Sequence, residues 1–343
     1  MLPIQRWLSI SGRARRARGV AGRVVRPRMC AFIHEMRTSR AAIGPVALLV
    51  ALLAALPARP AAAQACCAAT ALVSPARLQG MEQLGMGARL RSRSIVGSFD
   101  AGGRYRSAEI GDVDFAEDLF AVARVGLNGQ VAFILPIVQS RRTIPGYSTW
   151  GGGVGDLSIS GRYTLLLPGE HPILPGIALQ IGASIPTGRA VSDASDPLAT
   201  DATGTGTFEG TFGLNLQQIA GSWFVSFDGW IGQRIPRDNG GAPESYSPRL
   251  TGVLSGGYVL PSQISVGLFL TGQRQGPNQS TTDGKNIDGS AQSLLTAGAG
   301  AIFPVADVWR LSTTLSLDVL LSGLGRNQLA AAGLNVSLVR LWI

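Results

Sequence analysis

The sequence predicts an all-β fold, a transmembrane antiparallel β-barrel of about 12 strands that follows a cleaved signal peptide. Three observations predict it. An apolar export signal lies near the N-terminus, apolar and polar residues alternate over the remaining chain, and the connections between the alternating segments are long and short in turn. Because 45% of the 343 residues are hydrophobic, the chain is too apolar to be disordered.

The charge of the chain is unevenly distributed. The formal net charge is +9, but residues 1–65 hold eleven Arg and one acidic residue, Glu35, so the remaining chain is close to neutral at −1. The basic residues therefore belong to the N-terminal region, and no nucleic-acid partner is expected for the folded part.

The N-terminal region has the organisation of a secretory signal. A 16-residue apolar run, Ala41–Leu56, is followed by small residues that predict cleavage between Ala65 and Cys66. A membrane anchor is the alternative, but the run is short for a span of about 20 residues. Lipidation of Cys66 stays open, although Gln64 fits a lipobox poorly.

These signals divide the chain into four regions. We assign residues 1–35 to a non-native leader from an early start codon, with the true start at Met29 or Met36, and residues 36–65 to the signal peptide. Residues 66–84 are expected to form a short periplasmic segment, and residues 85–343 the β-barrel.

Twelve segments with strand-like alternation make up the predicted barrel. In residues 156–167, for example, Leu157 and Ile159 share one face while Ser158 and Ser160 share the other. The twelve candidate strands lie near residues 85–96, 117–127, 130–142, 156–168, 174–186, 206–217, 222–234, 248–260, 263–274, 291–303, 308–321 and 328–343.

The connections between these segments predict the orientation of the barrel. Long polar connections alternate with short ones such as Asn128-Gly129, which is typical of a type I′ hairpin turn. Long loops outside and short periplasmic turns are the layout of outer-membrane barrels. A secreted β-sandwich also alternates, but the strands are long for a sandwich.

The positions of aromatic residues also favour the barrel. They cluster near strand ends, where a membrane-interface girdle is expected. The expected girdle consists of Phe120, Tyr163, Trp223, Tyr258, Phe303, Trp309 and Trp342.

Two neighbouring segments resemble a known family. Residues 153–165, GVGDLSISGRYTL, resemble its G-x-G-D-L-x-L-x-x-K/R-Y-x-L motif, and residues 178–188 resemble its apolar strand ending in P-T-G. The family is the outer-membrane transporter family of the meta-pathway of phenol degradation. The resemblance implies a barrel that passes small, often aromatic or apolar, molecules across the outer membrane, and it carries over no catalytic residue.

The polar faces of the strands supply the candidate lumen. Arg89, Arg91 and Arg93 are spaced at period two and share one face. An arginine that faced lipid at the middle of the bilayer would cost about 2–4 kcal/mol, so this face is expected to point into the lumen. Opposing acidic residues would make this column either a selectivity feature for anionic solutes or an ion-paired network that fills the lumen. The candidate lumen-lining residues are Arg89, Arg91, Arg93, Arg124, Arg162, Glu209, Asp228, Arg234, Arg249, Arg310 and Asp318.

The chain offers little for catalysis. After Cys66 it holds one histidine, His171, and the adjacent pair Cys66 and Cys67, so neither a histidine-dependent triad nor a metal site is expected. Three acidic residues of one loop, Asp193, Asp196 and Asp201, are interpreted as solvated. No enzymatic activity and no cofactor is predicted.

The expected function is that of a transporter or channel for small solutes in the outer membrane of a Gram-negative bacterium. The alternative is a non-conducting structural or adhesive barrel that acts through its extracellular loops. Outer-membrane lipid, lipopolysaccharide, the barrel-assembly machinery and a small-molecule solute are the expected partners.

Overall fold

The structure is a computed structural model that describes residues 76–343 apart from 109–110, 172, 240–241 and 283–284. The expected leader, signal peptide and cleavage site at Ala65 and Cys66 lie outside the described residues. In the part of the chain that is described, no helix is long and apolar enough to cross a membrane.

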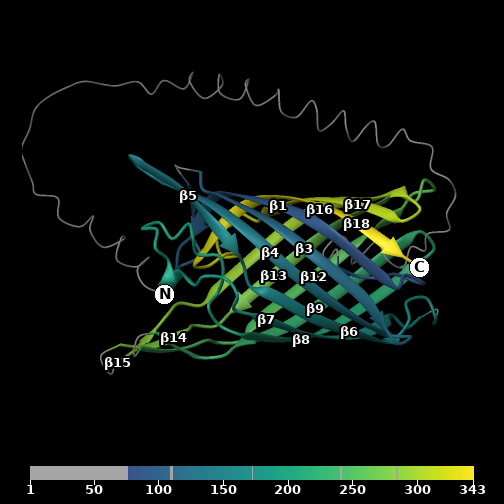
Figure 1. Cartoon of the computed structure of the whole chain (residues 1–343), viewed down its shortest axis with the longest axis horizontal. Helices are drawn as coiled ribbons and strands as arrows, with labels where there is room; N and C mark the ends of the chain where they lie inside the picture. Colours follow the sequence, from purple (N-terminus) through teal and green to yellow (C-terminus); the bar gives the residue numbers. More distant parts are fainter. Residues whose placement is uncertain (1–75, 109–110, 172, 240–241, 283–284) are drawn as a thin grey trace, which may run out of the picture. The chain divides into compact units, whose positions relative to one another are not determined.

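The described chain forms a closed antiparallel β-barrel of twelve strands (Figure 1). The strands are β1 (Leu84–Phe99), β3 (Val113–Val125), β4 (Gly129–Ile144), β6 (Leu157–Leu166), β7 (Gly176–Ile185), β8 (Glu209–Ala220), β9 (Trp223–Arg234), β12 (Arg249–Val259), β13 (Ser265–Gln275), β16 (Gln292–Ala306), β17 (Trp309–Asp318) and β18 (Gln328–Trp342). Each pairs with the next barrel strand along the chain, and this confirms the predicted fold class.

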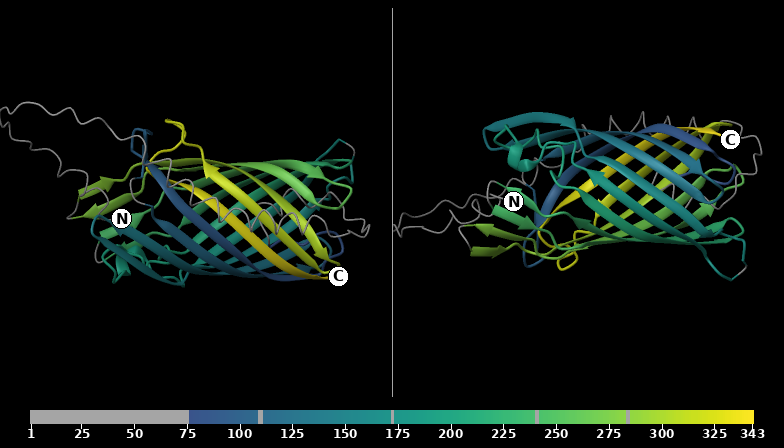
Figure 2. Two further views of the ribbon diagram at one scale, coloured as in Figure 1. Left: turned by 90° about the horizontal axis from the view of Figure 1, so that it is seen from above. Right: turned by 60° about the horizontal axis from the view of Figure 1, so that its bottom comes forward.

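The barrel closes between its last and first strands. β18 pairs with β1 from Leu84↔Trp342 to Phe99↔Gln328, with one register shift between Ile95 and Gly97. Figure 2 shows the last strand, in yellow, beside the first, in dark blue. Closure pairs the backbone groups that an open sheet would expose at its edges.

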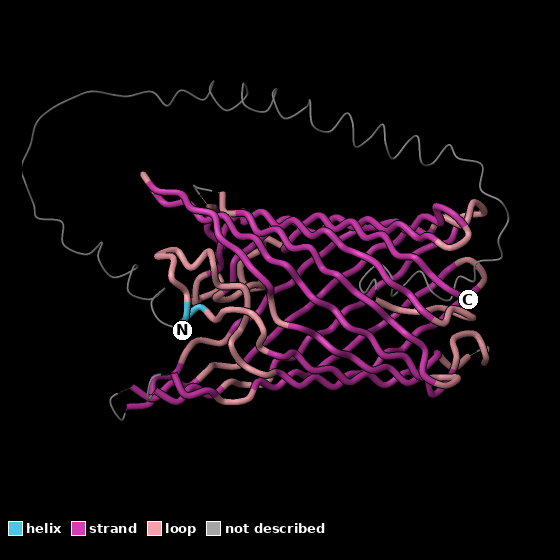
Figure 3. Tube along the Cα trace, viewed as in Figure 1, coloured by secondary structure: helices cyan, strands magenta, loops and turns pink. Residues whose placement is uncertain are grey.

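The two ends of the barrel differ as the sequence predicts. Short turns join β3 to β4, β8 to β9 and β16 to β17 at one end, and the longer connections lie at the other (Figure 3). One turn differs from its prediction: Val125 pairs with Gly129, so residues 126–128 form the turn and Gly126, at φ +65°, takes the left-handed conformation. A type I′ turn at Asn128-Gly129 was the wrong prediction.

The long connections contain more structure than the sequence indicates. β5 (Tyr147–Val154) pairs with β4 and extends it into a projecting hairpin (Figure 1). β2 (Tyr105–Ser107) pairs with β1, and a 3-10 helix occupies Val191–Asp193. A separate sheet joins two connections in the order β10 (Arg237–Asn239), β11 (Ala242–Ser245), β14 (Gln279–Thr282) and β15 (Lys285–Asp288).

Alternate residues of each strand form an inner and an outer face. Gln180 of β7 hydrogen-bonds Asp228 of β9 across the intervening strand β8, a reach that only the concave side of a barrel permits. The outer face instead exposes an apolar band. It includes Met86, Leu90, Leu119, Phe133, Ile181, Phe212, Val225, Phe227, Leu254, Leu268, Leu270, Leu315, Leu317, Leu334 and Leu338.

Six of the seven expected girdle residues lie on the outer face near the short turns. They are Tyr163, Trp223, Tyr258, Phe303, Trp309 and Trp342. Trp223 and Tyr258 make an edge contact with ring centroids 4.9 Å apart. Phe120 was wrongly placed among them, because it lies on the inner face and is only 4% exposed.

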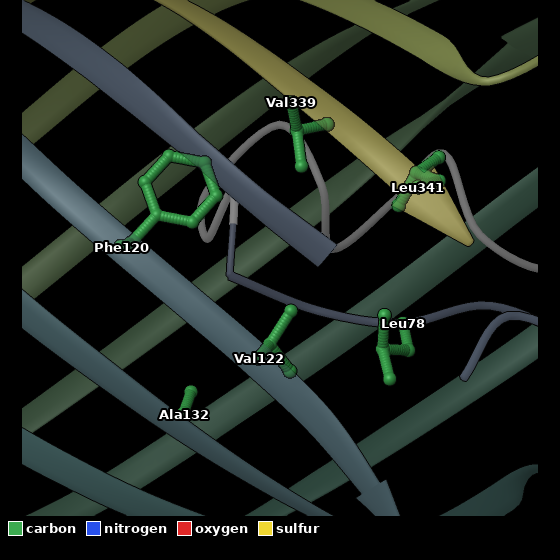
Figure 4. Packing of buried hydrophobic residues seen from close by; sticks show 6 residues of the cluster. All are labelled: Leu78, Phe120, Val122, Ala132, Val339 and Leu341. Atoms are coloured by element: carbon green, nitrogen blue, oxygen red, sulfur yellow. The ribbon is translucent and has the colours of Figure 1, made fainter. Parts of the chain in front are cut away.

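Phe120 is buried because the chain before β1 packs against it. Leu78 lies in one buried apolar cluster with Phe120 and Val122 of β3, Ala132 of β4, and Val339 and Leu341 of β18 (Figure 4). We call residues 76–83 the N-terminal plug. This segment belongs to the region that the sequence analysis expects at residues 66–84, and its described part contacts the inner face of the barrel.

Two glycines of β1 make room for this contact. A Cβ on Gly85 would lie 3.1 Å from Val122 Cγ1 and 3.3 Å from Leu341 Cδ2, and one on Gly87 would lie 2.8 Å from Phe120 Cζ. Without side chains at these positions, Leu78 and Phe120 reach over β1 to the residues of β18. The plug therefore covers the inside of the closing seam.

Candidate solute pathway through the barrel

The arginine column of β1 is paired with acidic residues of neighbouring strands. Arg91 donates two hydrogen bonds of 2.7 Å to Asp118 of β3, and Arg89 donates another of 2.7 Å from Nε to Asp118 Oδ2. Arg93 lies 3.5 Å from Asp318 of β17 across β18. Three arginines therefore share two buried carboxylates on this wall.

A second ion-paired cluster lies on the opposite wall near the long loops. Glu209 of β8 is buried and accepts a hydrogen bond of 3.1 Å from Arg234 of β9. Arg249 of β12 donates to the other oxygen of the same carboxylate. Glu209 therefore lies between two guanidiniums, as Asp118 does between those of Arg89 and Arg91.

In the middle of the inner wall, one acidic side chain is held by hydrogen bonds from uncharged residues. Asp228 of β9 accepts hydrogen bonds from Asn215 at 2.8 Å, from Gln180 at 3.0 Å and from Ser226 at 3.3 Å. Arg162 of β6 donates to Asn215 Oδ1 at 3.1 Å. Asn215 therefore stands between the Arg162 guanidinium and the Asp228 carboxylate.

The N-terminal plug is held by charged and polar residues of the short-turn end. Arg310 of β17 pairs with Glu82, and Arg124 of β3 donates to the carbonyls of Glu82 and Gly80 at 2.8 and 2.6 Å. Burial raises the pKa of the Glu82 carboxyl, while the positive charge of Arg310 acts in the opposite direction. Gln130 of β4 accepts a hydrogen bond from the backbone N–H of Leu78 and donates one to its carbonyl, both at 3.2 Å.

All eleven residues proposed from the sequence as lumen-lining lie on the inner-face register of their strands. The structure groups them into the two ion-paired walls, the central network and the plug contacts. The sequence did not identify Asp118, Trp230 or the plug residues Arg77 and Glu82. Alternation in β3 was a usable signal for Asp118, whereas the positions of Arg77 and Glu82 depend on tertiary contacts.

Two cavities lie along the interior. A cavity of about 800 Å³ is lined by Thr251, Gln273, Gln292 and Leu294, with Arg326 of the loop after β17. A smaller one of about 100 Å³ adjoins the N-terminal plug in the centre. Trp230 of β9 lines both cavities.

The position of Trp230 is set by its neighbours. A Cβ added to Gly213 of β8 would lie 2.3 Å from Trp230 Cδ1, so the indole needs the space above that glycine. The indole N–H then donates to Gln180 Oε1 at 3.2 Å. Trp230 thus presents a fixed aromatic surface to both cavities.

The barrel was compared with solved structures of outer-membrane proteins. A crystal structure of an outer membrane channel from Pseudomonas putida F1 matches with a TM-score of 0.65 and 16% identity, over 78% of this chain and 98% of that one. The KdgM porin (TM-score 0.42, 7% identity, 76% and 99% coverage) and the CymD monoaromatic hydrocarbon channel (0.40, 8%, 80% and 93%) are less similar. The first of these shows the fold of the chain.

A family model identifies the chain more closely. The model described as "Putative MetA-pathway of phenol degradation" matches residues 99–338. Among proteins of curated function, none matches. The match spans more than half of the chain and includes both segments whose motifs resemble this family, and the chain therefore belongs to it.

Proposed function

We propose that the chain is an outer-membrane channel that passes small solutes through its lumen. The observation that carries the proposal is the pair of cavities inside the closed barrel. A cavity of about 800 Å³ at the long-loop half and a smaller one of about 100 Å³ are both lined by Trp230, within a wall that is largely polar inside and apolar outside. Polar and charged linings of this kind are what water-filled pores use.

The solutes proposed are small and include aromatic or apolar molecules. The family description refers to phenol degradation, and Trp230 offers an aromatic face beside the polar side chains of Gln180 and Asp228. The eleven inner-face residues proposed from the sequence would then govern which charged species pass. Outer-membrane lipid, lipopolysaccharide and the barrel-assembly machinery are the expected partners in the membrane.

One observation favours a different function, a structural or adhesive barrel that does not conduct. The acidic side chains of both inner walls are paired with arginine, and the N-terminal plug occupies the short-turn end. The ordered sheet of β10, β11, β14 and β15 in the long connections would then be the working surface.

Planar-bilayer recording and liposome swelling separate the two functions. Full-length processed barrel, checked for folding by heat-modifiable gel migration, is expected to show discrete conductance steps and to admit small neutral solutes. Barrels denatured before reconstitution are the control. Folded protein that gives neither current nor swelling would leave the structural or adhesive function as the better account.

A further inference from the structure

The outer face of the barrel carries a charged and aromatic surface near the long-loop end. Arg141 of β4 lies opposite Val113 of β3 and Trp150 of β5 in the sheet register, so the three side chains share one face. The other face of the same strands carries Asp114, which pairs with Arg142 at 2.6 Å on the inside of the barrel. Arg141 therefore points away from the lumen, toward the membrane and its surface.

Two aromatic rings lie beside this arginine. The rings of Phe115 and Trp150 are stacked across β4, with centroids 6.2 Å apart and 15° between their planes. The guanidinium carbon of Arg141 lies 5.9 Å from the centre of the Trp150 ring, within the range of a cation–π contact. Trp150 is 56% exposed and Phe115 is 42% exposed, so both rings are open to a further partner. We call Phe115, Arg141 and Trp150 the outer-face cluster.

The positive charge of Arg141 has no acidic partner among the described residues. Its Nε donates a long hydrogen bond of 3.4 Å to the hydroxyl of Ser148. Glu117, which shares the outer face of β3, lies opposite Ile137, four residues along β4 from Arg141. The neighbouring Arg142, in contrast, is ion-paired inside the barrel. The cluster thus presents a cation that an anion from outside the chain can reach.

The position of the cluster indicates which part of the membrane it meets. Arg141 and Trp150 lie where β4 pairs with β5, in the hairpin that projects at the long-loop end (Figure 1). In an outer-membrane barrel this end faces the outside, and exposed tryptophans lie at the level of the lipid headgroups. The outer leaflet is built from lipid A, whose headgroup is a disaccharide that bears phosphate groups.

The chemistry of the cluster matches both parts of that headgroup. A guanidinium binds phosphate through paired, charge-assisted hydrogen bonds. The apolar face of a sugar ring is removed from water when it packs on an exposed aromatic ring. We propose that the outer-face cluster is a binding site for lipid A, with Arg141 on a phosphate and the rings of Trp150 and Phe115 against the sugar. This site does not depend on whether the barrel conducts.

Native mass spectrometry of the full-length processed barrel in detergent, titrated with lipid, measures the binding. The probes are diphosphoryl lipid A and phosphatidylglycerol, an anionic lipid that offers a phosphate without a sugar ring. The native barrel should bind lipid A about tenfold more tightly than phosphatidylglycerol, because only lipid A presents a ring to the aromatic side chains. Equal affinity for the two lipids would overturn the assignment.

Substitutions at two positions test the assigned contacts. Arg141→Gln should weaken lipid A binding about tenfold, the loss expected for a charge-assisted contact, and Arg141→Lys should recover part of it. Trp150→Ala should weaken lipid A binding and leave phosphatidylglycerol binding unchanged, because the ring contacts the sugar. Arg106→Gln is the control and should bind as the native chain does, since this exposed arginine at the same end already faces Asp100 at 3.5 Å.

The outcomes separate a built site from general attraction to basic residues. Full affinity for lipid A in Arg141→Gln, or an equal loss in Arg106→Gln, would overturn the site. A loss in Trp150→Ala that is the same for both lipids would overturn it as well. Heat-modifiable gel migration shows that each variant is folded. Conductance in bilayers that lack lipid A tests the channel separately, so either proposal can fail alone.

Discussion

Arg91 meets Asp118 through two parallel hydrogen bonds of 2.7 Å, from Nε to Oδ2 and from Nη2 to Oδ1, while the same carboxylate also receives Arg89. The Asp118 side chain is 1% exposed and that of Arg91 is 42% exposed. A buried acid thus holds two cations at the wall of the lumen, and the charge of the pathway depends on it.

Replacing Asp118 by Asn should make the channel more selective for anions and less stable. Two guanidiniums would lose their counter-charge, at a cost of about 2–3 kcal/mol, below the range for fully buried pairs because Arg91 remains hydrated. The reversal potential across a KCl gradient measures the selectivity, and the unfolding temperature in gels measures the stability. Asp193→Asn, in an exposed loop, is the control, and an equal shift in both variants would contradict the assignment.

Leu78→Asp should displace the N-terminal plug and increase single-channel conductance several-fold. The substitution places a carboxylate among apolar side chains, where an unpaired charge costs several kcal/mol. Met81→Asp introduces the same charge into the same segment at a position that is 75% exposed, and should leave conductance unchanged. If the two variants conduct alike, the plug does not limit the current.

Trp230→Ala should increase the conductance further when it is combined with Leu78→Asp. The indole lines both cavities, so its removal enlarges the space in each. Trp223→Ala, which truncates an exposed outer-face tryptophan, is the matched control. A double variant that conducts no better than Leu78→Asp alone would show that the two cavities do not lie in series.

The long connection between β7 and β8 should keep its structure from pH 7 down to about pH 4. Hydrogen bonds to Asp201 from the hydroxyl and backbone N–H of Ser195, at 2.6 and 2.9 Å, hold its pKa well below its usual range, and Arg189 adds to this. A lowered pKa means that the stabilisation is present above the ordinary value of 3.8 and is lost only as the pH falls through the lowered one.

Hydrogen exchange of this loop, corrected for the intrinsic pH dependence, is the measurement. Protection should be level over that range in the native chain, and lower at every pH in Asp201→Asn. Glu170→Gln, in a short turn at the other end, is the control. A loss of protection between pH 6 and 5 would contradict the role of Asp201.

The barrel itself was predictable because membrane strands obey a simple period. Alternation located all twelve strands, and the lengths of the connections located the two ends. Phe120 and Trp230 share the inward register of Asp118 and Asp228, but alternation does not show what an inward aromatic side chain packs against. The plug covers Phe120, and the space above Gly213 accommodates Trp230.

The candidate pathway was predictable only as a set of residues. Period two places Arg89, Arg91 and Arg93 on one face, but the pairing of Arg93 with Asp318 crosses a strand that is distant in sequence. The sheet formed by β10, β11, β14 and β15 was not predictable for the same reason, because it forms only where two connections that are separate in sequence pair with each other.

The plug also has a consequence for the order of assembly. Leu78 contacts β3, β4 and β18, and Glu82 pairs with Arg310 of β17, so the docking site is complete only after the last strand has joined the first. Docking therefore follows closure and adds its free energy to the closed form alone. The peptide bonds of residues 76–83 would be open to a protease in a nascent barrel and sheltered in a finished one, which makes their cleavage a reporter of when the seam closes.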